Sequence, residues 1–122
     1  MSPRMVVSLF ASLLCLLSVS MNNTANQNTS VDETEVQRVL NVSQDIAYGE
    51  YLAGECASCH SATVASGSNV PVIHGAKADY LVRALLEYKT GVRENTTMKN
   101  VAEVLGDEEI AVLAYYLATL NP

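Results

Sequence analysis

Beyond about residue 30, apolar residues recur at spacings of three and four, which is the period of an amphipathic helix. The clearest apolar stripe closes the chain, at Ile110, Leu113, Leu117 and Leu120. Two earlier stripes are formed by Ile46, Gly49, Leu52 and Ala53 and by Leu81, Ala84, Leu85 and Tyr88. No run of β-branched residues alternates with polar ones, so the pattern predicts an all-α fold.

Residues with helix-capping and helix-breaking preferences give the bounds of the predicted helices. The predicted starts are Ser30 (in the capping-box pattern Ser30-Val-Asp-Glu33), Ser43, Asp79 and Asp107. The predicted ends are about Leu40, the cysteines near residue 56, and Gly91. Residues 98–105 form a further short helical segment that Gly106 stops, and residues 61–78 are expected to be a loop.

The first twenty residues have the pattern of a secretory signal peptide. Arg4 is followed by an apolar run of about fifteen residues, which is short for a bilayer span of about 20. Ser18 to Ser20 forms a small-x-small site, so we expect cleavage near residue 20 and export to the periplasm. The alternative is that residues 1–20 stay attached as a membrane anchor.

Composition divides the remaining chain into a tail and a domain. Residues 21–42 read as a polar linker with a possible short helix, and residues 43–122 as one folded domain. Acidic residues number 13 against 7 basic ones, which argues against a nucleic-acid partner. The densest acidic group consists of Glu103, Asp107, Glu108 and Glu109. It either docks on a basic partner or is a solvated helix start.

The sequence Cys56-Ala-Ser-Cys59-His60 is a C-x-x-C-H motif, the attachment site of c-type haem. Its spacing lets two thiols form thioethers with neighbouring vinyl groups, while the next residue turns its imidazole toward the iron. The cofactor prediction is therefore one covalent haem c. The alternatives are a thioredoxin-like redox pair, half of a zinc site, and a simple disulfide beside an incidental histidine.

The second axial ligand is predicted to be Met98, because a lone methionine among polar residues has little use as core filler. His74 is the rival ligand, and its other readings are a haem-propionate contact or plain exposure. Pro71 opens the same loop, and its carbonyl can accept the Nδ1–H of His60 behind the metal. An ordinary turn proline is the alternative for Pro71.

With these residues in place, the chain resembles class I cytochromes c from about Asp45 to Leu120. The resemblance is carried by Gly49, seven positions before Cys56, by the C-x-x-C-H site, by Val70-Pro71, by Asp79 to Leu81, by Tyr88 to Arg93, by Met98 and by Asp107 to Leu117. The chain is similar to periplasmic two-haem respiratory cytochromes and, more closely, to cytochrome subunits of flavocytochrome c sulfide dehydrogenases. It departs from the two-haem pattern in having one C-x-x-C-H motif, and from the respiratory relatives at His74-Gly75.

The resemblance implies a class I cytochrome c fold, with short helices around one covalently bound haem. It makes Cys56 and Cys59 the haem attachment residues, His60 and Met98 the axial ligands, and Pro71 the carbonyl behind His60. Gly49 would let the first and last helices of the fold cross closely, against Tyr115 or Tyr116.

The expected function is one-electron transfer in the periplasm, without catalysis by the chain alone. The alternative is a haem subunit of an oxidoreductase, with a flavoprotein sulfide dehydrogenase subunit as its partner. A membrane oxidase is another candidate redox partner, and no stable membrane insertion is expected once residues 1–20 are removed. An apolar patch of Val70, Val72 and Ile73 would favour a permanent partner over free diffusion.

Overall fold

The computed structural model describes residues 30–61 and 68–122, and within these ranges it contains five helices and no strand. The helices are α1 (Glu33–Leu40), α2 (Ile46–Ala57), α3 (Ala78–Thr90), α4 (Thr96–Glu103) and α5 (Asp107–Thr119). The predicted all-α fold is confirmed. The predicted signal peptide, residues 1–20, lies outside the described residues, as does the first part of the predicted linker.

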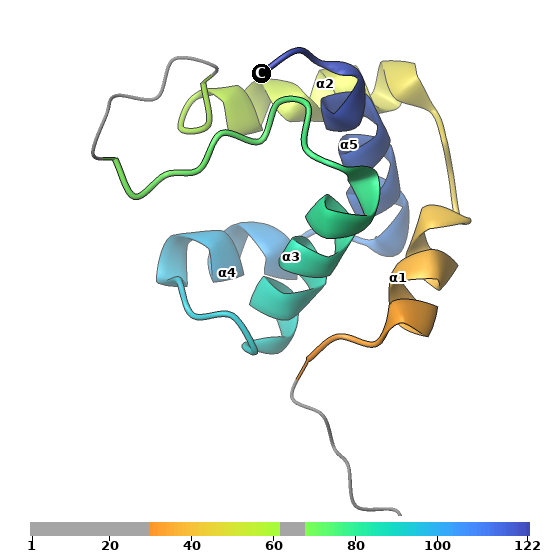
Figure 1. Ribbon diagram of the computed structural model, residues 1–122, viewed down its shortest axis with the longest axis vertical. Helices are drawn as coiled ribbons and strands as arrows, with labels where there is room; N and C mark the ends of the chain where they lie inside the picture. Colours follow the sequence, from red (N-terminus) through yellow and green to blue (C-terminus); the bar gives the residue numbers. More distant parts are fainter. Residues whose placement is uncertain (1–29, 62–67) are drawn as a thin grey trace, which may run out of the picture.

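The helices pack around α5, which contacts α1, α2 and α3, while α4 packs on α3. Figure 1 shows α5 crossing α2 and α1 lying at the outer side of α3 and α5. The loop of residues 68–77 runs from the region of α2 to the start of α3, and it faces α4 across one side of the molecule. None of the described helices combines the length and the apolar character needed to span a bilayer.

Helix α5 is the centre of the core. The predicted stripe is confirmed at Ile110, Leu113 and Leu117, which are buried, and Leu120 is partly buried against the same core. Ala111, Val112 and Ala114 are buried as well, because other helices cover α5 on more than one side. A stripe read from sequence therefore understates the burial of a helix that neighbours surround.

The apolar faces of α2 and α3 differ from the predicted stripes. In α2, Gly49 and Ala53 are buried, but Ile46 is exposed because it lies at the first position of the helix. In α3, Leu81 is buried as expected, and the rest of the buried face is formed by Val82 and Leu86. The buried face of α3 is rotated relative to the predicted stripe because α1, α4 and α5 all pack on this helix.

Helix α1 belongs to the packed core, although it precedes residue 43, where the predicted domain begins. Val36 and Val39 are fully buried in the main core cluster. Arg38 of α1 forms an ion pair with Asp107 at 2.8 Å, and Arg83 of α3 donates a 2.6 Å hydrogen bond to the Val31 carbonyl. The core therefore extends N-terminal of residue 43.

Several helix starts differ from the predicted ones by a few residues. Helix α1 is capped by Asp32 instead of Ser30, and α2 by Asp45 instead of Ser43. Asp79 lies in the first turn of α3, where no side chain caps the helix. Ser and Asp have similar capping preferences, so sequence alone does not separate neighbouring candidates. At α5, Gly106 is the N-cap residue and its N–H donates to the carboxylate of Glu109 at 2.9 Å.

The close crossing of α2 and α5 depends on Gly49. A Cβ atom at this position would lie 2.2 Å from the carbonyl oxygen of Val112 and 2.8 Å from the Cβ of Tyr116. The predicted contact is confirmed for Tyr116. Tyr115 has a different role, because its hydroxyl donates to the Leu40 carbonyl at 3.1 Å and so ties α5 to the end of α1.

Candidate haem-binding site

The C-x-x-C-H motif lies at the C-terminal end of α2 and in the turn that follows it. Cys56 is in the last turn of the helix, and its carbonyl accepts hydrogen bonds from the N–H of Cys59 at 3.2 Å and of His60 at 2.8 Å. This turn fixes the three residues relative to one another. Both thiols are free, so no disulfide joins them. Cys56 is half-buried against the core, whereas Cys59 is exposed.

His60 is held in one orientation by the loop of residues 68–77. Its side chain is 8% exposed, and its Nδ1 lies 2.8 Å from the carbonyl oxygen of Pro71. Because a carbonyl oxygen can only accept, Nδ1 must carry a hydrogen, so the neutral form of this ring has its lone pair on Nε2. A neutral imidazole of this kind is suited to bind a metal ion through Nε2. The expected hydrogen bond to Pro71 is therefore present.

Met98 is the third residue of α4 and is partly buried. Its N–H donates to the side chain of Asn95, the N-cap residue, at 2.9 Å, so α4 begins two residues before the predicted start at 98. Helix α4 faces the loop of residues 68–77 (Figure 1). His74 lies within that loop, beside Gly75, whose N–H bonds to the end of α5. Met98 and His74, the two candidates for the second axial ligand, therefore lie in different segments, Met98 in α4 and His74 in the loop.

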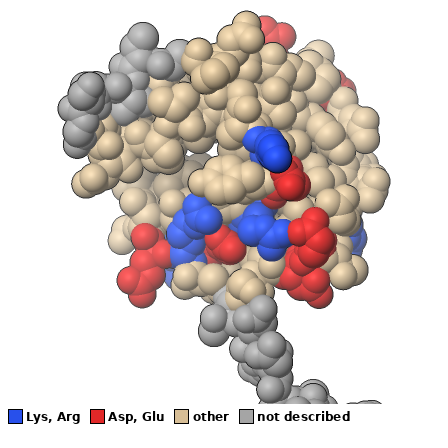
Figure 2. Space-filling view, in the orientation of Figure 1, with Lys and Arg blue, Asp and Glu red and all other residues tan. Residues whose placement is uncertain are grey.

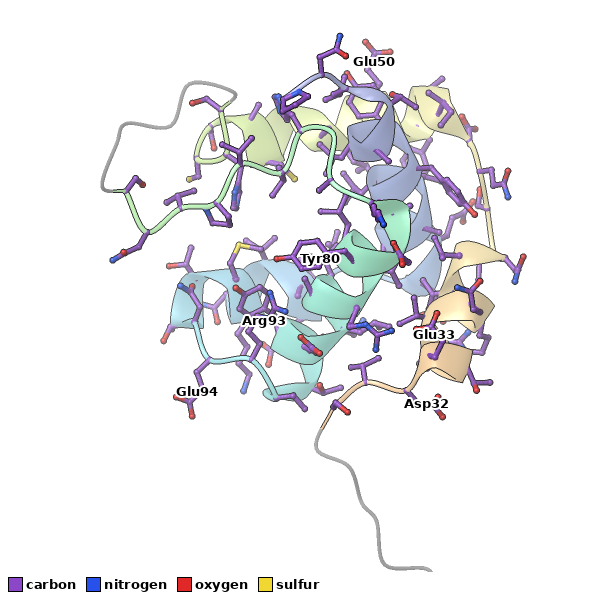
Figure 3. The ribbon with its side chains drawn as sticks, viewed as in Figure 1. Asp32, Glu33, Glu50, Tyr80, Arg93 and Glu94 are labelled. Carbon is purple, nitrogen blue, oxygen red and sulfur yellow. The ribbon has the colours of Figure 1, made fainter. Side chains whose placement is uncertain are left out.

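The residues around this region suit a flat apolar group. Figure 2 shows a recess between the loop of residues 68–77 and the charged lower half of this face, and Tyr80 lies between that loop and α4 (Figure 3). The exposed fractions are 44% for Val72 of the loop, 49% for Tyr80 of α3 and 41% for Val101 of α4. Val101 follows Met98 by three residues and therefore shares its helix face. Large apolar side chains from three segments would lose water contact under a porphyrin.

Burial affects the chemistry of the attachment residues. It raises the pKa of the Cys56 thiol, and the nearby carboxylate of Glu55 acts in the same direction. A raised thiol pKa lowers the fraction of Cys56 present as thiolate. The donor set of two thiols, one imidazole with a free Nε2 and one thioether fits a covalently attached haem.

Sequence reasoning assigned no role to a cluster around Arg93. Its guanidinium lies 5.8 Å from the ring centre of Tyr80 and 5.3 Å from that of Tyr88, and it pairs with Glu87 at 2.8 Å. These contacts join the residues after α3 to Tyr80, and Figure 3 shows Arg93 lying beside Tyr80. The turn at Gly91, which has φ of 78°, brings Arg93 back along α3. A local pattern search misses such a return of the chain.

Most of the predicted acidic group has partners within the fold. Asp107 pairs with Arg38 at 2.8 Å, and Glu103 pairs with Lys99 at 3.7 Å. Glu109 accepts the hydrogen bond from Gly106 that starts α5. On the face drawn in Figure 2, acidic and basic side chains are interspersed. These observations favour the interpretation of a helix start over that of a docking surface.

Comparisons with known proteins identify the family of this domain. Residues 46–121 match the sequence model of the family described as Cytochrome c. The chain is 37% identical to the "Cytochrome subunit of sulfide dehydrogenase" of Chlorobaculum tepidum over 60% of its own length and 66% of that relative. It is 35% identical to "Cytochrome c-553" of Helicobacter pylori, over 57% of this chain and 75% of that protein.

A third relative, the "Thiosulfate dehydrogenase electron acceptor" of Stutzerimonas stutzeri, is 31% identical over 55% of this chain. The matched segment covers 33% of that protein, so the chain spans only part of some relatives' length. The family match covers more than half of this chain and includes α2, α3, α4, α5 and the C-x-x-C-H motif. The chain therefore belongs to the cytochrome c family, whose members are electron carriers with a covalently bound haem c.

Proposed function

We propose that the chain carries one electron at a time on a single haem c attached to Cys56 and Cys59, with His60 and Met98 as axial ligands. The observation that carries this proposal is the orientation of His60. The imidazole is almost fully buried, and its Nδ1 is hydrogen-bonded to the Pro71 carbonyl at 2.8 Å. In the neutral ring, Nε2 is then the nitrogen that can donate a lone pair to a metal ion. A histidine held in this way, directly after two free thiols, has the state that an axial ligand requires.

Bound haem would supply a ferric and ferrous couple, and the residues of the chain set its conditions. The hydrogen bond to Pro71 makes His60 a stronger electron donor and fixes its ring. The thioether of Met98, if bound to the iron, would favour the ferrous state relative to a second imidazole and so raise the reduction potential. With His60 and Met98 both bound, neither dioxygen nor a substrate would have an open site. Val72, Tyr80 and Val101 are large exposed side chains that would shield a bound haem from water.

The proposed setting is the periplasm, with other redox proteins as donor and acceptor. Support for export comes from the predicted signal peptide, and support for redox partners comes from the printed names of the relatives. We favour a diffusing carrier. Of the patch expected for a permanent partner, only Val72 is well exposed, while Val70 and Ile73 are partly buried and Ile73 packs against the core.

The second candidate function is that of a haem subunit in a sulfide-oxidising flavoprotein complex. The observation in its favour is the 37% identity to the cytochrome subunit of a sulfide dehydrogenase. Purification of the native protein from its host separates the two functions. A carrier elutes alone at the size of one chain, whereas a subunit elutes with a flavin-containing partner.

An optical experiment tests the proposed ligation. The protein is matured with haem in a periplasm, and ferric spectra are compared for wild type, Met98→Ala and His74→Ala. We expect the weak far-red band of a sulfur–iron bond in wild type and in His74→Ala, and its loss in Met98→Ala. A colourless wild-type protein, or one in which an alkylating reagent modifies both Cys56 and Cys59, would refute haem attachment. Loss of the band in His74→Ala alone would refute Met98 as the ligand.

A further inference from the structure

The Pro71 carbonyl that orients His60 lies in a segment without regular secondary structure. Residues 68–77 form only turns and bends, and Pro71 itself is exposed. Hydrogen bonds within the segment are local, such as the one from the Ala76 N–H to the Ile73 carbonyl at 3.3 Å. The position of the carbonyl must therefore be fixed by contacts between this loop and the rest of the fold.

Gly75 provides one such contact, at the C-terminal end of α5. Its N–H donates to the carbonyl of Leu117 at 2.9 Å, and its φ is +73°, in the left-handed region. A Cβ atom here would lie 2.9 Å from Cδ of Pro122 and 3.0 Å from the carbonyl oxygen of Leu120. The loop and the residues after α5 therefore approach so closely that only glycine fits without displacement.

Ile73 provides a second contact, two residues from Pro71. It is partly buried and packs against the main core cluster, as does Leu120 on the opposite side of the turn. The segment from Ile73 to Gly75 is thus attached to the core by an apolar side chain and to α5 by a backbone hydrogen bond. Pro71 precedes this attached segment by two residues.

We infer that Gly75, whose N–H is hydrogen-bonded to the C-terminal end of α5, is a positioning residue that holds the Pro71 carbonyl against Nδ1 of His60. This inference rests on the proposed role of His60 as an axial ligand. Gly75 acts at a distance from the imidazole, through Ile73 and Pro71. The end of α5 would then control how strongly His60 donates to the metal.

The physical consequence is a link between the packing of this turn and the electronic state of the imidazole. While the Nδ1–H is bonded to the carbonyl, it is protected from exchange with solvent and increases the basicity of Nε2. A displaced turn would open this hydrogen bond for part of the time. The Nδ1–H would then exchange faster, and the weaker donor would stabilise the ferric state less, so the reduction potential would rise.

The experiment uses the haem-loaded protein with Gly75→Ala. Nuclear magnetic resonance of the reduced protein follows exchange of the His60 Nδ1–H, and a redox titration gives the potential. We expect the His60 Nδ1–H to exchange about tenfold faster than in wild type, which corresponds to the loss of one hydrogen bond. We also expect a higher reduction potential. Ile73→Ala loosens the same turn without backbone strain, so it gives a smaller change in the same direction even if Gly75→Ala does not accumulate.

Gly91→Ala is the matched control. Gly91 also has a left-handed φ, of +78°, but a Cβ atom there would meet nothing within 4 Å. It should keep the wild-type exchange rate of the His60 Nδ1–H despite similar backbone strain. Unchanged exchange in Gly75→Ala and Ile73→Ala, or an equal increase in Gly91→Ala, would overturn the inference while leaving the ligation intact. A wild-type protein without a haem-shifted His60 ring signal would overturn the proposed function together with the inference.

Discussion

Replacing Gly49 by alanine tests whether the crossing of α2 and α5 determines stability. The closest atom to the new Cβ would be the Val112 carbonyl oxygen at 2.2 Å, and this backbone atom cannot rotate away as a side-chain end can. Relieving the overlap requires the two helices to separate. Overpacking of this kind costs about 3 kcal/mol at the upper end of its usual range.

Helix propensity acts in the opposite direction for this substitution. Alanine stabilises a helix interior by about 1 kcal/mol relative to glycine, so the net loss expected for Gly49→Ala is about 2 kcal/mol. In guanidinium chloride, the unfolding midpoint of the haem-loaded protein, followed by circular dichroism, should fall by about 0.5 M.

Gly54→Ala is the control in the same helix. Gly54 is exposed and has nothing within 4 Å of an added Cβ, so this variant should gain up to about 1 kcal/mol of stability. The two variants should therefore move in opposite directions. If Gly49→Ala were as stable as Gly54→Ala, the steric argument for the crossing would be wrong.

Three further predictions concern α1 and its contacts. Val36→Ala should lower the free energy of unfolding by about 2 kcal/mol in the same denaturation assay, because the side chain is fully buried. Tyr115→Phe should cost about 1 kcal/mol by the same measurement, since it removes the hydrogen bond that ties α5 to the end of α1. Arg38→Gln should be less stable than wild type at neutral pH, because Arg38 pairs with Glu35 and Asp107. The hydrogen bond from Arg38 holds the pKa of Glu35 below its usual 4.5, so this difference should shrink as the pH falls below about 4.5 and should not widen there.

The helical fold could be predicted from sequence because the signals for it are local. The stripe through Ile110, Leu113 and Leu117 and the stop at Gly91 depend only on neighbouring residues and chain geometry. The C-x-x-C-H motif is local as well, since one turn of chain sets its chemistry. Exact helix starts were missed at Ser30 and Ser43 because nearby aspartates cap equally well.

The rest of the site depends on contacts between distant segments. Nothing near Arg93 in the sequence indicates that Tyr80 would lie over its guanidinium. The hydrogen bond from Gly75 to Leu117 could not be predicted from sequence either, because it joins residues that only the fold brings together. The sequence leaves two interpretations of Pro71, a hydrogen-bond acceptor for His60 and an ordinary turn proline.

The N-terminal helix also constrains the order in which the protein can assemble. One of its partners lies far along the chain, as the hydrogen bond between Tyr115 and Leu40 spans 75 positions. Contacts between such distant segments form more slowly than contacts within a helix. Until α5 docks on α2, Cys56 lacks the core against which it is half-buried in the folded protein, whereas Cys59 is exposed in either case.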